Sequence, residues 1–291
     1  MPIDPAKATT AAPRVAPLAW GPKDILLYHL GIGAGIPATD PDELRYTLES
    51  RLHVLPSFAT VAGGGMAGSG LSTPGIDVDL SAVLHGGQTV TLHRPLPVRA
   101  TAATQTSRVA AVHDKGKAAV IVLRADVTDD DGQPLWTSVS DIFVKGEGGF
   151  GGERGPSARS PRPETPATAP DLTVERHVRE DQALLYRLSG DWNPLHADPE
   201  FAKLAGFEKP ILHGLCSYGI VLKAVVDTAL DGDVARVRSY TTRFAGVVYP
   251  GETLRVRMWR DAPGPGRIQV SVTAVERADA PVLTDTVVEH S

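Results

Sequence analysis

The sequence predicts an α+β protein built from two related halves, and three observations support this. Residues 214–230 carry apolar side chains on nearly every face, with Lys223 and Asp227 as the only charges, which is typical of a buried central helix. Strand-like segments follow it, and a short motif recurs in both halves of the chain. A long helix followed by consecutive strands favours a curved antiparallel sheet wrapped around the helix.

The boundary between the halves is visible in the composition. From residue 146 to residue 170, Gly and Pro supply 11 of 25 residues. Such a stretch buries too little apolar surface to fold by itself and predicts a flexible linker. We therefore expect a first domain over residues 1–145, a linker over 146–170 and a second domain over 171–291.

The recurring motif is L-L-Y-x-L. It occupies residues 26–30 and residues 184–188, an offset of 158. Because it lies at the same place in each half, we interpret it as a trace of duplication. The first half is then expected to keep the scaffold and to lack the polar groups of the second. At this offset Asp191 faces Gly33, Asn193 faces Gly35 and His196 faces Ala38.

The hydrophobic pattern also places shorter elements. Residues 181–188 are expected to form a short helix, with Glu180 or Asp181 near its N-terminus. Runs rich in apolar and β-branched residues predict the strands of both halves. We expect them at residues 108–113, 118–128 and 136–144, and at 236–248, 253–260, 267–276 and 281–288.

Composition is that of an ordinary water-soluble enzyme. The chain has 291 residues, 42% hydrophobic and 22% charged, which suits roughly two domains. The net charge of −5 gives no electrostatic case for nucleic-acid binding. The lone Cys216 excludes an internal disulfide and, within an apolar run, predicts a buried inert thiol. No signal peptide, membrane span or SKL-type address is seen, so we expect no membrane association and a cytoplasmic location.

A polar turn in the second half, residues 189–196, is the strongest candidate for a functional site. It carries Asp191, Asn193 and His196, and Pro194 should keep it from continuing as a helix. A water between Asp191 and His196 would meet a strong acceptor and a group able to donate or accept near pH 7. The alternative is an ordinary turn whose Asp and Asn side chains bond the local backbone.

This run and several others resemble the MaoC-like, R-specific 2-enoyl-CoA hydratases, which include the hydratase part of the peroxisomal multifunctional enzyme. The similarity extends along almost all of the chain, and ordered motifs at compatible separations are more specific than any single one. The matching segments are Pro2-Ile3-Asp4-Pro5, residues 26–33, Leu84-His85-Gly86, Arg94-Pro95-Leu96-Pro97, residues 189–199, Arg243-Phe244 and Tyr249-Pro250-Gly251.

The resemblance implies a double hot-dog fold, in which each repeat has a central helix wrapped by an antiparallel sheet. It implies reversible hydration of trans-2-enoyl-CoA to (3R)-3-hydroxyacyl-CoA in fatty-acid or related acyl-chain metabolism. No cofactor is expected, since coenzyme A is part of the substrate. Relatives of this kind suggest a homodimer.

The resemblance also assigns roles within the second half. Negative charge builds on the thioester oxygen during hydration, and the N–H of Gly214, near a helix N-terminus, is suited to stabilise it. The family places its oxyanion-hole amide at the matching glycine; the alternative is a glycine kept for packing. Asp191 is expected to take the proton of the water and His196 to protonate C2, with Asn193 orienting the water. The reverse assignment of acid and base stays open.

The first half is expected to shape the acyl tunnel and to contact coenzyme A. By resemblance, His85, Gly86, Lys115 and Phe244 match substrate contacts of the family. An ammonium at Lys115 would pair with phosphates, and its alternative is a solvated turn lysine. Gly87 stands where many relatives carry a glutamate, so the local contacts there are open.

Other patterns carry less weight. The chain has no HExxH, no CxxC and no dense His/Cys cluster, so we expect no metal. The run Gly63-x-Gly65-x-x-Gly68 matches the dinucleotide formula but is followed by a loop-like sequence, so we interpret it as a loop. His213 could touch the site or simply pack beside it.

Three other functions share some of these features. A dehydratase of acyl-carrier-protein thioesters would use the same triad and bind a partner protein. A thioesterase would direct water at C1, which the Asp–Asn–His turn with Gly214 argues against. A non-catalytic acyl-CoA-binding subunit would be expected to have a broken triad, and here the triad is intact.

Overall fold

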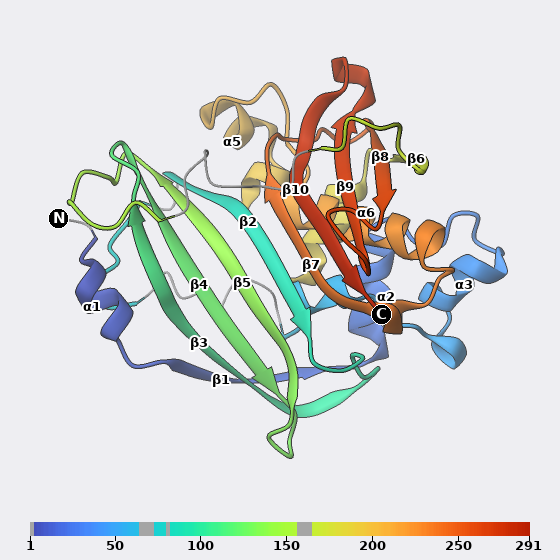
Figure 1. The fold of residues 1–291 in the computed structure, drawn as a ribbon, viewed down its shortest axis with the longest axis horizontal. Coiled ribbons are helices and arrows are strands. Elements are labelled where there is room, and N and C mark those ends of the chain that lie inside the picture. The colour runs from blue at the N-terminus through green and yellow to red at the C-terminus, as the bar shows by residue number, and fades with distance from the viewer. Residues whose placement is uncertain (1–2, 64–72, 80–81, 156–164) are drawn as a thin grey trace.

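The computed structural model describes residues 3–63, 73–79, 82–155 and 165–291. Ten antiparallel strands form one continuous sheet in the order β1-β3-β4-β5-β2-β7-β10-β9-β8-β6 (Figure 1). The strands are β1 (Arg14–Trp20), β2 (Val83–Leu92), β3 (Ala100–Asp114), β4 (Ala118–Thr128), β5 (Pro134–Lys145), β6 (Leu172–His177), β7 (Val237–Phe244), β8 (Thr253–Arg260), β9 (Arg267–Ala274) and β10 (Ala280–His290).

The strand order confirms the duplication inferred from the repeated motif. Read from its outer edge, the first half runs β1-β3-β4-β5-β2 and the second runs β6-β8-β9-β10-β7. The halves meet where β2 pairs with β7, with Thr89 opposite Thr241. The hydroxyl of Thr89 donates to that of Thr241 at 3.1 Å. Each strand of one half thus has a counterpart in the other.

The predicted central helix is present as α6, Gly214–Ala229, within one residue of its expected end. It lies in the second half, beside the strands coloured orange to red (Figure 1). Its side chains are buried in a core that also contains Trp20, Phe58 and Trp136 of the first half. One hydrophobic core therefore spans both halves, which explains the continuous sheet.

The remaining helices are short. They are α1 (Pro5–Thr10), α2 (Pro22–Gly31), α3 (Pro41–Thr47), α4 (Gln182–Tyr186) and α5 (Pro199–Leu204), with 3-10 turns η1 (Glu49–Arg51), η2 (Pro56–Thr60), η5 (Arg187–Ser189), η6 (Pro194–His196), η7 (Val234–Arg236) and η8 (Val275–Arg277). The helix expected over residues 181–188 is α4 continued by η5. In the described part of the chain, no helix is long and apolar enough to cross a membrane.

Among the described residues, a long central helix is present only in the second half. At the offset of 158, Gly214 falls opposite Pro56, where the first half has only the 3-10 turn η2. Residues 64–72 lie outside the described residues, and so does most of the Gly63–Gly68 run.

The segment expected to be a flexible linker is held at its described ends. The carboxylate of Asp114 accepts hydrogen bonds from the N–H groups of Gly149 and Gly151, at 2.9 and 2.7 Å. Phe150 packs against the apolar cluster of the first half. At the other end, the indole of Trp259 donates to the carbonyl of Thr168 at 2.9 Å. Backbone hydrogen bonds and the packed Phe150 ring therefore hold these ends, and a flexible linker over residues 146–170 stays a prediction.

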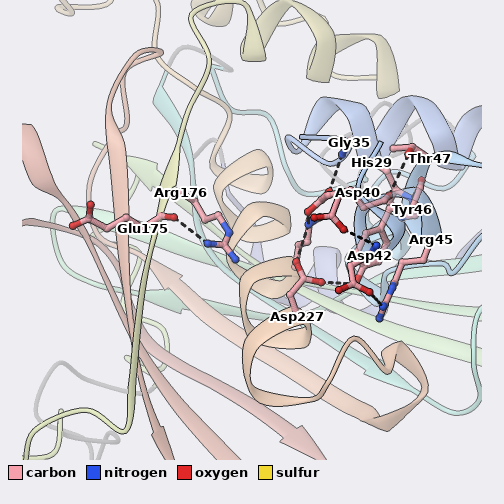
Figure 2. Close-up of polar contacts among 12 residues, drawn as sticks. His29, Gly35, Asp40, Asp42, Arg45, Tyr46, Thr47, Glu175, Arg176 and Asp227 are labelled. Carbon is pink, nitrogen blue, oxygen red and sulfur yellow. Dashed lines mark hydrogen bonds and ion pairs between the residues drawn. The ribbon is translucent and has the colours of Figure 1, made fainter. Parts of the chain in front are cut away.

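A buried ionic network ties α3 of the first half to α6. The ammonium of Lys223 lies 2.6 Å from a carboxylate oxygen of Glu43 and 2.7 Å from one of Asp227. The hydroxyl of Tyr46 donates to Asp227 at 2.7 Å, and Figure 2 shows these two side chains facing each other. The network thus fixes the first half against the helix that carries Gly214.

Candidate active site

The polar turn predicted at residues 189–196 follows α4 and η5. Gly190 has φ of 122°, a conformation that favours glycine, and it turns the chain from η5 toward Asp191. One carboxylate oxygen of Asp191 accepts the N–H of Asn193 at 3.2 Å. The side-chain oxygen of Asn193 accepts the N–H of Leu195 at 3.0 Å and so caps η6. Asn193 is exposed, and its side chain bonds the local backbone of the turn. This is the role expected for Asn193 if the segment is an ordinary turn.

His196 has a defined orientation. Its Nδ1 lies 2.8 Å from the carbonyl oxygen of Ile211 and must donate to it, which leaves the lone pair of the neutral ring on Nε2. Burial lowers the pKa of His196. The Ile211 carbonyl and the Asp191 carboxylate raise this pKa, but by less. The positive charge of Arg187 lowers the pKa further. The neutral ring is therefore favoured near pH 7.

His213 completes a compact cluster with Asp191 and His196. One ligand-type atom of each residue lies within 4.8 Å of the others. The rings of His196 and His213 stack with centroids 3.7 Å apart and planes at 28°. His213 is 1% exposed, and its Nε2 lies 3.2 Å from the main-chain oxygen of Asp191. Of the two interpretations that the sequence left open, contact with the site is the correct one.

The cluster does not converge on a single ion as it stands. His196 uses Nδ1 for Ile211, and His213 uses Nε2 for the carbonyl of Asp191. The remaining lone pairs lie in the planes of two stacked rings, whereas a zinc ion needs both directed to one point at about 2.0–2.1 Å. A single small polar molecule such as water fits the free groups better, because it donates to one and accepts from another.

Gly214 lies at the first position of α6, where a backbone N–H has no partner within the helix. A Cβ at Gly214 would lie 3.1 Å from the ring of Phe244, so glycine lets the two approach closely. Phe244 in turn packs against His85, with ring centroids 4.9 Å apart. The helix N-terminus adds positive potential at this point.

His85 is brought to the site from the first half. Its Nε2 is buried and has no hydrogen-bond partner among the described residues. Burial lowers the pKa of His85 to about 4, against smaller raising effects that include the charge of Asp191. The structure thus places His85, Phe244 and Gly214 together beside Asp191, although they come from three separate elements.

Of the other two expected substrate contacts, Gly86 follows His85 in β2, whereas Lys115 lies in a turn of the first half. Gly86 sits at the irregularity of β2 between His85 and Gly87, where a Cβ would lie 3.2 Å from the carbonyl oxygen of Asp141 on β5. Lys115 lies in the turn after β3, where its ammonium contacts the carbonyl of Arg154. In Figure 1 this turn lies on the first-half side of the molecule, whereas α6 lies in the second half.

Sequence reasoning missed Arg187. Its guanidinium lies 4.6 Å from the centre of the Trp192 ring, and its charge acts on both His196 and His213. The residue occupies the variable position of the repeated motif, facing His29 of the first half. A basic residue one turn before a candidate dyad was the available signal.

The equivalent place in the first half cannot act in the same way. Pro56, which faces Gly214 at the offset of 158, has no N–H to offer. It lines a cavity of about 30 Å³ together with Leu92 and Val237. Small residues replace the polar triad there. The duplicated scaffold therefore carries one complete set of polar groups.

Comparisons with known proteins agree with this geometry. Residues 19–146 match the MFE-2 hydratase 2 N-terminal domain, and residues 162–280 match the MaoC like domain. An enoyl-CoA hydratase of Mycobacterium tuberculosis is 48% identical over 290 residues, which is 98% of each chain. A peroxisomal enoyl-CoA hydratase 2 of Arabidopsis thaliana is 41% identical, over 81% of each chain. A crystal structure of a MaoC-like dehydratase from Phytophthora capsici has a TM-score of 0.87 and 29% identity, covering 99% of this chain and 98% of that one.

Two fused hot-dog repeats, with an Asp–His pair at the N-terminus of α6, define a hydro-lyase of the MaoC-like class. Within that class, the first half matches a hydratase 2 domain and the second half matches the MaoC like domain. It belongs to the MaoC-like hydratase 2 family.

Proposed function

We propose that this protein catalyses the reversible hydration of trans-2-enoyl-CoA to (3R)-3-hydroxyacyl-CoA in fatty-acid or related acyl-chain metabolism. The observation that carries the proposal is the cluster of Asp191 and His196 beside the N-terminus of α6. One water between these two residues and one thioester oxygen at Gly214 would satisfy the free groups of the site. The relatives that bear enoyl-CoA hydratase names support the substrate class.

The protonation state of His196 suggests the order of proton transfer. The neutral ring presents a lone pair on Nε2, so His196 takes a proton from the water as its oxygen bonds to C3. The electron pair of the double bond moves to the thioester oxygen, where the Gly214 N–H stabilises the charge. The imidazolium, held beside Asp191, then returns the proton to C2. This differs from the assignment expected from the sequence, in which Asp191 takes the proton of the water and His196 protonates C2, because the lowered pKa of His196 disfavours a pre-protonated acid.

The substrate would enter along the side chains of the first half. Phe244 lies against Gly214 and His85 lies against Phe244, so both would border the acyl thioester, with the Gly86 backbone next to His85. Lys115 would reach the phosphates of coenzyme A. Because coenzyme A belongs to the substrate, the reaction needs no further cofactor. A homodimer and a cytoplasmic location stay predictions, and several relatives are named as peroxisomal.

Loss of enoyl-thioester absorbance with crotonyl-CoA and with trans-2-decenoyl-CoA tests the proposal. We expect wild-type turnover on at least one ester, and a loss of about 10³-fold or more in kcat for both Asp191→Asn and His196→Gln. Asp198→Asn is the matched control, because this exposed carboxylate only caps α5 and its removal should leave turnover intact. Coupling the product to a (3R)-specific or a (3S)-specific dehydrogenase reads its configuration.

Each other outcome has a definite meaning. A folded wild type that is inactive on both CoA esters, but active on the corresponding acyl-carrier-protein thioester, would identify a carrier-protein dehydratase. Binding of acyl-CoA without turnover would identify a non-catalytic subunit. Turnover that survives both substitutions would mean that the site lies elsewhere.

A further inference from the structure

His213 contacts both members of the Asp191–His196 pair. It bonds the main-chain oxygen of Asp191 through Nε2 at 3.2 Å and stacks on the His196 ring at 3.7 Å between centroids. Its other neighbour is the ring of Tyr186, 4.9 Å away and fully buried. Because His213 immediately precedes Gly214, it connects the turn that bears the pair to the start of α6.

The hydrogen bond defines the state of this histidine. A carbonyl oxygen accepts only, so Nε2 carries the proton and Nδ1 the lone pair. That Nδ1 is buried and has no hydrogen-bond partner among the described residues. Burial, with the positive charges of His196 and Arg187, lowers the pKa of His213 to about 2, against the Asp191 carbonyl, which raises it. A proton entering the cluster therefore stays on His196.

We propose that His213 is a positioning residue for the hydration, one that fixes the Asp191 main chain and the His196 ring relative to the Gly214 amide. The proposal rests on the proposed function of this site. The water, the base and the oxyanion donor then keep one relative geometry, because His213 holds the Asp191–His196 pair next to the N-terminus of α6. The neutral face of His213 also lies against the imidazolium that forms on His196, an arrangement that favours a cation.

The chain offers a matched control in His29. This histidine is fully buried, its Nδ1 lies 2.8 Å from the carbonyl oxygen of Tyr46, and its ring contacts an aromatic ring at 5.6 Å. It lies in α2 of the first half, outside the catalytic cluster. Replacing either histidine by Phe removes one buried N–H to a carbonyl and keeps an aromatic ring. At His29 the change also removes the Nε2 that accepts the N–H of Leu55 at 3.3 Å, so the control carries the larger structural change.

The test compares His213→Phe with His29→Phe in kinetics and in urea unfolding. We expect His213→Phe to lower kcat about 10- to 100-fold, the scale that follows small misplacement of reacting groups, with KM changed less than about twofold. His29→Phe should lose at least as much stability and keep kcat within about twofold of wild type. A His213→Phe enzyme with unchanged kcat, or with a loss no larger than that of His29→Phe, would overturn the proposal.

A second measurement does not depend on folding of a variant or on turnover. Nitrogen NMR of the ¹⁵N-histidine-labelled wild type reads the tautomer of each histidine ring. The spectrum of His196→Gln lacks the signals of His196 and so separates them from those of His213. His213 should remain the neutral Nε2–H tautomer from about pH 5 to about pH 9. Titration of His213 in this range, or an Nδ1–H tautomer, would refute the proposal. If the wild type showed no turnover at all, the proposed function would be refuted, whereas the NMR result on His213 would remain valid.

Discussion

Tyr28 and Tyr186 occupy equivalent positions in the two halves and pack on each other, with ring centroids 6.1 Å apart and planes at 59°. They belong to α2 and α4, the helices that carry the repeated motif. A Cβ at Gly31 would lie 3.1 Å from the Cα of Tyr186, so the two helices touch through backbone. The repeated motif is thus a contact between the halves, and it fixes the start of the polar turn that follows α4.

The oxyanion role of Gly214 can be separated from its packing role. Proline is tolerated at the first position of a helix and removes the N–H, and His213 before it already has the extended ψ of 135° that proline requires. Gly214→Ala meets the same Phe244 ring but keeps the N–H. We expect Gly214→Pro to lower kcat about 10²- to 10³-fold relative to Gly214→Ala. Equal steady-state activities of the two variants would show that the amide is not used.

Arg187 should set the acid side of the pH–rate profile. Hydration in our scheme needs neutral His196, so kcat/KM falls as the pH drops through the pKa of that ring, which lies below its ordinary value of 6.5. Arg187 lowers this pKa, so Arg187→Gln should raise it and move the acid limb to higher pH. Arg179→Gln, which removes a surface partner of Asp181, is the control and should leave the limb in place. A limb that stays or moves to lower pH in Arg187→Gln would contradict the scheme.

The network around Lys223 should contribute strongly to stability. Lys223→Met leaves the carboxylates of Glu43 and Asp227 near each other without their cation, and Lys223 is only 7% exposed. Breaking a buried pair in this way typically costs about 3–5 kcal/mol. The exposed Arg179–Asp181 pair is the comparison, where Arg179→Ala should cost about 1 kcal/mol or less. Urea unfolding measures both, and similar small losses would mean that the network is solvated in solution.

Lys115 provides a test of the coenzyme A contact. If its ammonium pairs with a phosphate, Lys115→Ala should raise KM for crotonyl-CoA about 3- to 10-fold, with kcat unchanged. The KM for crotonyl-pantetheine, which lacks the phosphates, should not change. Lys117→Ala is the control, because Lys117 is an exposed lysine of the same turn. An unchanged KM for crotonyl-CoA would limit Lys115 to its local contact with the carbonyl of Arg154.

Elements with a complete hydrophobic pattern could be predicted from the sequence. The expected strands 118–128 and 253–260 have the observed bounds, and α6 ends one residue before its predicted end. The edge strands β1 and β6 were missed, and so was β2. Pro17 interrupts β1, β6 has exposed residues at alternate positions, and Gly86 and Gly87 interrupt β2. Their strand structure comes from pairing with neighbours rather than from local propensity.

The sequence alone determined the duplication, the polar turn with Asp191 and His196, and the glycine at the start of the central helix. These are local in the chain, and spacing and composition report local structure directly. Only the tertiary structure decided that His213 stacks on His196 and that His85 of β2 reaches Phe244 of β7. It also showed that Asn193 caps its own turn and that Arg187 acts on the dyad. Such contacts join elements that lie far apart in sequence, and packing of the two halves around one core brings them together.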